Sequence, residues 1–145
     1  MTFTYERWIH IGDTDCAGIV YFTQHLHICH EAYEAWLRAG GITPAAFGSE
    51  RIVPIVHSEM DYKYPLRWGD LCQVTLTVSD LHPHGFTLAY RLMTPAFPKA
   101  AALGSTRHVC IHPQTRRRQP LPPLLSAWLH QHRGPELAPD FVRDP

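Results

Sequence analysis

One stretch of the sequence, residues 22 to 39, constrains the fold more than any other. Apolar and aromatic residues recur in it at steps of three and four, which predicts an α-helix: Phe22, Leu26, Cys29, Tyr33, Trp36 and Leu37. Small or apolar residues occupy other sides of this helix, so we expect it to be buried over much of its circumference. Gly40 and Gly41 follow directly and predict its end. A helix this apolar needs a second layer of structure to cover it.

The rest of the chain, as far as residue 112, is dominated by strand patterns. Residues 3 to 11 interleave aromatic and β-branched residues with polar ones, and residues 71 to 81 alternate between an apolar and a polar face. Further strand patterns cover 52–64, 86–92 and 100–112. The turns between the strands are predicted at 68–70, 82–85 and 95–99. Short turns favour hairpins, so the sheet should be an antiparallel meander. We therefore predict an α+β fold in which a sheet of about five strands wraps around one long central helix.

A change of composition after Pro113 suggests where this domain ends. The chain of 145 residues suits one hydrophobic core, which we place in residues 1–112. Residues 113–145 form a basic, Pro-rich tail in which 124–132 has the pattern of a short helix. We expect the last segment, 134–145, to be loose.

Charge and hydropathy exclude several classes of protein. Lys plus Arg and Asp plus Glu number 13 each, a balance that argues against a nucleic-acid partner. No apolar run approaches the ~18 residues that a membrane span requires. The first residues lack the basic head and apolar core of a signal peptide, so we expect a cytoplasmic protein. The four cysteines are scattered, which predicts free thiols and no metal site built on them.

The segment GDTDCAGIVYF, residues 12 to 22, carries the strongest chemical signal. Asp13 and Asp15 lie two residues apart, and Gly18 and an apolar run separate them from the start of the predicted helix. Either the two carboxylates cap a turn or the helix, or one of them reacts with a substrate. The residues alone leave both interpretations open.

This segment, followed by QHLHICHEAYEAWL, resembles the signature of the hotdog-fold thioesterases of the 4-hydroxybenzoyl-CoA thioesterase family. The resemblance covers about residues 3 to 112 and includes the pattern Y-x-x-P-x-x-x-G-D at 62–70. Within the family, the chain is most similar to the 1,4-dihydroxy-2-naphthoyl-CoA hydrolases of phylloquinone biosynthesis, which share TFTYER, DTD-x-A-G-x-V-Y-F and Q-x-L-x-x-C-H-E-A-Y-E-x-W-L. The resemblance implies hydrolysis of an aromatic acyl-CoA thioester without a cofactor, since CoA is part of the substrate. It also implies a homodimer or homotetramer with active sites between two chains.

The resemblance also implies roles for particular residues. Asp15 would act as the nucleophile or as the general base toward water, and the sequence does not separate these mechanisms. The backbone N–H of Phe22, with Tyr21 beside it, would bind the oxyanion at the helix start. Gly18 would let the backbone approach the substrate, and His57 would contact the substrate from a strand that lines the groove. For Asp13 we favour a structural role, bracing the loop.

Other polar residues have both a functional and a structural interpretation. Glu31 and Glu34 lie on the predicted helix, where a related family carries its catalytic carboxylate, but with Asp15 present we expect them to be supporting groups. His25, His27 and His30 are better interpreted as packed or hydrogen-bonded residues than as metal ligands. The turn at 82–85 lacks the basic residues that bind CoA phosphates in the 4-hydroxybenzoyl-CoA enzymes. Other cations, each also interpretable as a solvated surface charge, are candidates for binding these phosphates instead, namely Lys63, Arg67, Arg91, Arg107, Arg116, Arg117 and Arg118.

Two alternative functions remain open at this level. One is hydrolysis of 4-hydroxybenzoyl-CoA or of short-chain and general acyl-CoA substrates by the same fold. The other is a non-catalytic hotdog domain that binds acyl groups. A binding domain does not need a carboxylate beside the thioester, so the reactive interpretation of Asp15 favours an enzyme.

Overall fold

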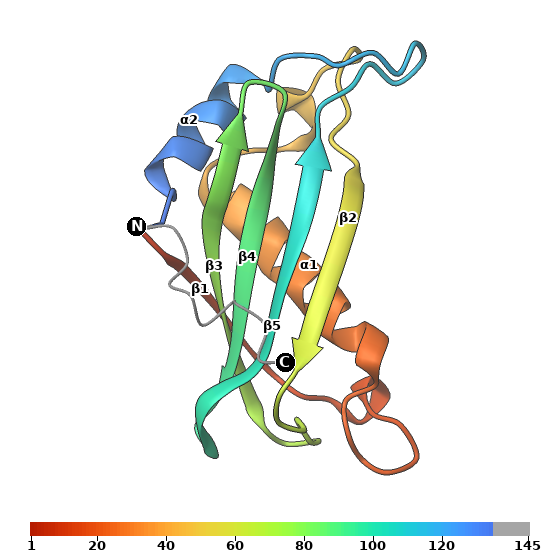
Figure 1. Cartoon of the computed structure of the whole chain (residues 1–145), viewed down its shortest axis with the longest axis vertical. Helices are drawn as coiled ribbons and strands as arrows, with labels where there is room; N and C mark the ends of the chain where they lie inside the picture. Colours follow the sequence, from red (N-terminus) through yellow and green to blue (C-terminus); the bar gives the residue numbers. More distant parts are fainter. Residues whose placement is uncertain (135–145) are drawn as a thin grey trace, which may run out of the picture.

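The computed structural model describes residues 1–134, which form one antiparallel sheet with a long helix across its inner face (Figure 1). The strands lie in the order β1-β3-β4-β5-β2. The elements are β1 Phe3–Trp8, α1 Phe22–Ala39, β2 Ile55–Tyr62, β3 Leu71–His82, β4 Gly85–Thr94, β5 Phe97–Val109 and α2 Pro123–Gln131, with 3-10 turns at Ile11–Asp13 and Pro44–Ala46. The predicted α+β fold of five strands and one long central helix is confirmed, and α2 is a second helix beside it.

The helix α1 has the predicted bounds and buries one face. It begins at Phe22 and ends at Ala39, and Gly41 follows with a left-handed φ of 69° that favours glycine. The residues that α1 buries are His25, Ile28, Cys29, Ala32, Tyr33 and Trp36. The opposite side is exposed at 23, 27, 30, 34 and 38. Burial over much of the circumference was therefore too strong a prediction for the single chain, because the sheet covers α1 from one side only.

The core lies between α1 and the inner faces of the three long strands. Their pairing is regular, with Leu76 opposite Tyr90 and Tyr90 opposite Gly104, and the inward side chains are almost fully buried. Two strand starts differ from prediction. The strand β5 begins at Phe97 because the turn before it needs only residues 95 and 96. Ile52 forms only an isolated bridge to Ile111, so the regular pairing of β2 begins at Ile55.

The two outer strands of the sheet are β1 and β2, and β2 is the more exposed. Seven of its eight residues are exposed, and only Met60 is partly buried. Ile55, Val56 and Tyr62 expose 41%, 52% and 49% of their surface. Proteins usually cover an edge strand that carries such apolar side chains. Unpaired backbone groups and apolar side chains therefore lie together along this edge.

The segment after Pro113 packs against the rest of the molecule. The predicted short helix is confirmed as α2, and its Leu125 and Leu129 are completely buried. The indole of Trp128 covers Gly40 and donates a hydrogen bond of 3.0 Å to the carbonyl of Trp36, at the end of α1. Residues on both sides of the predicted boundary at 112 therefore contribute to the same core. The prediction that residues 134–145 are loose lies, except for Gly134, outside the described part of the chain.

Within residues 1–134, no helix has both the length and the apolar character needed to cross a membrane.

Candidate active site

The loop between β1 and α1 presents Asp15 at its tip. Thr14 bridges Val20, and the N–H of Asp15 donates to the carbonyl of Ile19 at 2.9 Å, so the loop closes as a small hairpin. Gly18 has a φ of 75°, a left-handed conformation that strains any other residue. One carboxylate oxygen of Asp15 accepts the N–H groups of Ala17 and Ile19 at 2.8 and 3.3 Å. The other oxygen accepts no hydrogen bond from the described residues, and Asp15 is exposed, so this oxygen is free to meet a substrate or a water molecule.

The start of α1 carries backbone N–H groups that have no acceptor in the described residues. Tyr21 precedes the helix, and its N–H donates to the carbonyl of Asp13 at 2.9 Å. The N–H groups of Phe22 and Thr23 have no acceptor among residues 1–134, as expected in the first turn of a helix. The positive end of the helix dipole adds to these donors. Tyr21 and Phe22 are themselves 47% and 56% exposed, so the free N–H of Phe22 lies beside exposed aromatic side chains.

Tyr62, which sequence reasoning did not select, and His25, which it interpreted as a packed residue, lie against this turn. The hydroxyl of Tyr62, at the end of β2, donates a hydrogen bond of 2.7 Å to the carbonyl of Phe22. The Tyr62 ring also meets His25 edge to face, with 4.8 Å between ring centroids. His25 is 4% exposed, and burial lowers its pKa, which keeps the imidazole neutral. Tyr62 lies 40 residues from Phe22 in the sequence, so no local spacing could have revealed the contact.

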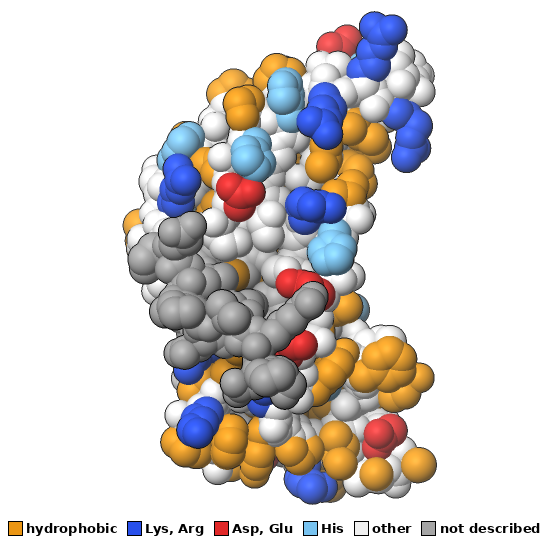
Figure 2. All heavy atoms as spheres, viewed as in Figure 1, with side chains coloured by type: hydrophobic (Ala, Val, Ile, Leu, Met, Phe, Trp, Pro, Cys, Tyr) orange, Lys and Arg blue, Asp and Glu red, His pale blue; other side chains and the backbone are white. Residues whose placement is uncertain are grey.

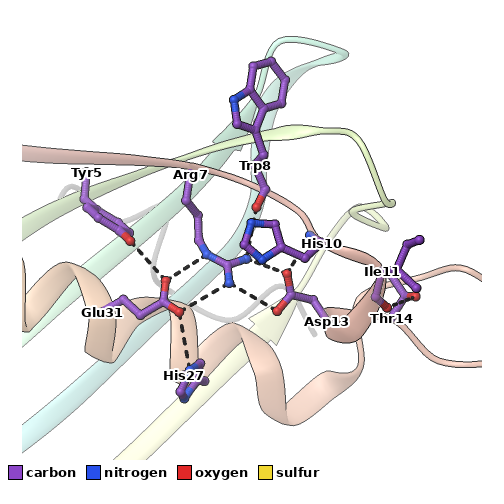
Figure 3. Close-up of polar contacts among 9 residues, drawn as sticks. All are labelled: Tyr5, Arg7, Trp8, His10, Ile11, Asp13, Thr14, His27 and Glu31. Atoms are coloured by element: carbon purple, nitrogen blue, oxygen red, sulfur yellow. Dashed lines mark hydrogen bonds and ion pairs between the residues drawn. The ribbon is translucent and has the colours of Figure 1, made fainter.

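A buried ionic cluster lies behind the loop (Figure 3). Asp13 is 6% exposed, and both of its carboxylate oxygens contact the guanidinium of Arg7. Burial alone would raise the pKa of Asp13, but the Arg7 guanidinium and the N–H of His10 hold that pKa below its ordinary value. Asp13 therefore braces the loop, as predicted. Glu31 contacts the other side of the guanidinium, whereas Glu34 forms an exposed pair with Arg38.

Some of the predicted residues lie away from Asp15. His57 is on β2, five residues before Tyr62, or about 17 Å along the strand, and its imidazole is 3.6 Å from the carboxylate of Glu59. Trp36, one of the apolar residues that predicted the helix, is fourteen residues from Phe22, about 21 Å along α1, and its full burial makes it a core residue. His27 and His30 are exposed on α1. Among residues 1–134, no three His, Cys, Asp or Glu side chains come together as a metal site.

Several of the candidate cations gather around a groove at the other end of β2. This groove has a volume of about 950 Å³, and Arg107, Arg116, Arg118, His82 and His84 line it together with the first residues of β2. Figure 2 shows arginine and histidine side chains grouped on the upper part of this face. The other four candidates, Lys63, Arg67, Arg91 and Arg117, do not line it. The turn at 82–85 lacks cations of its own, yet the fold brings arginines from two other segments beside it.

Comparisons with known proteins identify the family of this chain. The family model described as "thioesterase-like superfamily" matches residues 9–129. A 1,4-dihydroxy-2-naphthoyl-CoA hydrolase of Picosynechococcus is 44% identical over 89% of this chain and 92% of its own length. A protein of the same name from Rippkaea orientalis is 46% identical over 91% of this chain and 98% of its own length. The crystal structure of a 1,4-dihydroxy-2-naphthoyl-CoA thioesterase from Synechocystis superposes with a TM-score of 0.85 at 35% identity, covering 93% of this chain and 100% of that one.

Proposed function

The chain belongs to the thioesterase-like superfamily, and we propose that it hydrolyses 1,4-dihydroxy-2-naphthoyl-CoA to 1,4-dihydroxy-2-naphthoate and CoA. The observation that carries the proposal is the pairing of a free carboxylate oxygen on Asp15 with unpaired N–H groups at the start of α1. Relatives with this substrate in their names cover nearly the whole chain, which supports the naphthoyl group among aromatic acyl groups.

The two halves of the site divide the chemistry. A thioester resists water at neutral pH because water is a poor nucleophile. Asp15 either attacks the thioester carbonyl carbon directly or removes a proton from an attacking water molecule. The carbonyl oxygen becomes an oxyanion in both cases, and in this proposal the N–H of Phe22, which has no acceptor in residues 1–134, binds it. One such donor typically lowers the barrier by about 3 kcal/mol. The exposed rings of Tyr21 and Phe22 offer apolar contact to an aromatic acyl group.

In this proposal, CoA binds in the groove lined by Arg107, Arg116 and Arg118, and this groove belongs to a partner subunit. Within one chain, the groove and the end of β2 beside Phe22 are separated by seven residues of strand, or about 23 Å. Two β2 edges paired antiparallel would place the end of one strand beside the start of the other. The thioester would then lie at Asp15 of one subunit, and the CoA phosphates would contact Arg107, Arg116 and Arg118 of the other. His57, near the start of β2, would come close to the partner's site in the same way.

The exposed apolar edge of β2 supports this homodimer, and pairing of two dimers would give a tetramer. Light scattering at micromolar concentration should return a dimer or tetramer, and a monomer would contradict this part of the proposal. All four cysteines are free thiols, which agrees with the cytoplasmic location that we propose.

The proposal is tested with a panel of CoA thioesters that carry 1,4-dihydroxy-2-naphthoyl, 4-hydroxybenzoyl, benzoyl, and short and long straight-chain acyl groups. Release of free thiol gives kcat/KM for each one. We expect the naphthoyl ester to be preferred strongly. Equal rates for all esters, or a preference for aliphatic acyl groups, would still support a thioesterase but would contradict the proposed naphthoyl substrate.

Two variants connect the activity with Asp15. Asp15→Asn should reduce kcat by at least about a hundredfold while CoA still binds, because the amide keeps the shape of the side chain but is neither a nucleophile nor a base. The matched control is Glu6→Gln, which should leave kcat unchanged. It neutralises an exposed carboxylate on the outer strand β1 that accepts a hydrogen bond from Gln73. Equal rates for Asp15→Asn and the unmodified enzyme would remove Asp15 from the reaction. Binding of acyl-CoA without turnover by the unmodified protein would favour a non-catalytic acyl-binding domain.

A further inference from the structure

Arg7 is the only charged residue on the inner face of β1, which it shares with Phe3 and Tyr5. Its guanidinium contacts two carboxylates at once. The Nη1 and Nη2 atoms lie 2.5 and 3.2 Å from the two oxygens of Asp13, and Nε and Nη2 lie 2.8 and 3.3 Å from the two oxygens of Glu31 (Figure 3). The Arg7 and Asp13 side chains are only 11% and 9% exposed, so this pair is shielded from solvent, whereas the Glu31 side chain is 27% exposed.

The cluster joins three elements that surround the candidate site. Arg7 belongs to the sheet, Asp13 opens the loop that carries Asp15, and Glu31 is in the third turn of α1. Tyr5 also donates to Glu31 at 3.1 Å, and the backbone N–H of His10 donates to Asp13 at 2.7 Å. The guanidinium is therefore the only group in the described chain that contacts both the loop start and the helix through side-chain ion pairs.

Contacts made by other residues of the loop position Asp15, and these include Asp13 and the N–H of Val20, which donates to the carbonyl of Leu66 at 2.9 Å. The side-chain hydrogen bonds of Asp15 go only to Ala17 and Ile19, both within its own loop. They shape the loop but do not place it relative to α1. Asp13 meets both ends of the loop, because its carbonyl accepts the N–H of Tyr21 while its carboxylate is held by Arg7.

The geometry also explains why the cation is an arginine. Its planar fork presents separate N–H groups to two carboxylates on different elements, whereas a lysine ammonium is a single point of charge. If the guanidinium were lost, Asp13 and Glu31 would face each other as like charges in a partly buried space, which would push the loop and the helix apart.

We propose that Arg7 is a positioning residue for the reaction, fixing Asp15 relative to the free N–H groups at the start of α1. This role rests on the proposed thioester hydrolysis. Arg7 touches neither carbonyl nor nucleophile and acts through Asp13 and Glu31. A displacement of about 1 Å between reacting groups lowers a rate by about a hundredfold, so the clamp should affect kcat more than substrate binding.

The test is Arg7→Lys, which keeps the charge and loses the fork. We expect kcat to fall about tenfold to a hundredfold with a change in KM of less than about threefold. In the Asp15→Asn background, Arg7→Lys should produce no further loss of the residual rate, because the residue through which it acts is already disabled. The matched control is Arg38→Lys, which alters an exposed arginine–glutamate pair on α1, 2.9 Å long, and should change neither constant.

A second readout does not depend on activity. Hydrogen exchange at the amides of Ala17, Ile19 and Tyr21 should accelerate in Arg7→Lys, while exchange in β3 and β4 stays unchanged. A folded Arg7→Lys variant with unchanged kcat and unchanged loop exchange would overturn the proposal. So would a loss of activity that only follows a loss of folded protein, with exchange faster throughout the sheet. If the unmodified protein hydrolyses no thioester, the proposed function fails, and exchange confined to the loop would still support the clamp.

Discussion

His108 should make the stability of this protein depend on pH in a predictable way. It lies on the inner face of β5, 1% exposed, with its ring stacked on Phe86 at 4.5 Å between centroids. Its Nε2 is 2.8 Å from the hydroxyl of Thr106, and its buried Nδ1 has no partner among the described residues. Burial, with a smaller contribution from the nearby His30, lowers the pKa of His108 from 6.5 to about 4.

The sign and size of the effect follow from proton binding. In the unfolded chain, His108 takes up a proton near pH 6.5, whereas in the folded protein it does so only near pH 4. Between these values the unfolded state binds more protons, so the free energy of unfolding falls as the pH falls. Each pKa unit corresponds to about 1.4 kcal/mol, and the lowered pKa therefore predicts a loss of about 3 kcal/mol between pH 6.5 and 4.

The assay is urea unfolding from pH 7.5 to 4 for the unmodified protein and for His108→Gln, at one protein concentration since assembly also affects stability. Glutamine can place an amide where Nε2 bonds Thr106, but it does not titrate. Other groups that lose stability in acid, such as Asp13 and His25, contribute to both proteins and cancel in the difference. The unmodified protein should lose about 3 kcal/mol more than the variant. Two parallel curves would refute the reasoning.

Three further perturbations test individual contacts. In Gly40→Ala, the added Cβ would lie 2.6 Å from the Trp128 ring, so we expect about 1–3 kcal/mol of destabilisation by differential scanning calorimetry; an unchanged melting temperature would show that α2 is not held against α1. Tyr62→Phe removes the hydrogen bond to the carbonyl of Phe22, worth about 1 kcal/mol, and should lower kcat about fivefold in steady-state assays; an unchanged kcat would make Tyr62 irrelevant to the first turn of α1. Arg118→Glu should raise KM for CoA thioesters about tenfold but leave N-acetylcysteamine thioesters, which lack phosphates, unaffected; equal effects on both would move the CoA phosphates away from the groove.

Much of the local structure could be predicted from the sequence because it depends on near neighbours. The three- and four-residue spacing over 22–39 predicted α1 with its observed bounds, since each turn of a helix is completed within four residues. The alternation over 71–81 predicted β3 for the same reason. Strand ends were less certain, because whether Ile52 or Phe97 joins a ladder depends on a partner strand far away in the chain. The Asp15 loop could be recognised in the sequence because the residues of its signature are contiguous.

The contacts that give the candidate site its geometry join distant residues. Arg7 and Glu31 are 24 positions apart, Tyr62 and Phe22 are 40 apart, and Trp128 reaches Trp36 across 92. No periodicity links such pairs, because they meet only once the sheet has closed over α1. The sequence by itself determined the helix and the alternating strands, which follow from local spacing, and the resemblance of residues 12–22 to a family signature indicated the candidate reactive carboxylate. Tertiary structure alone decided that Arg7 clamps the loop and that α2 completes the core, because packing selects partners by proximity in space.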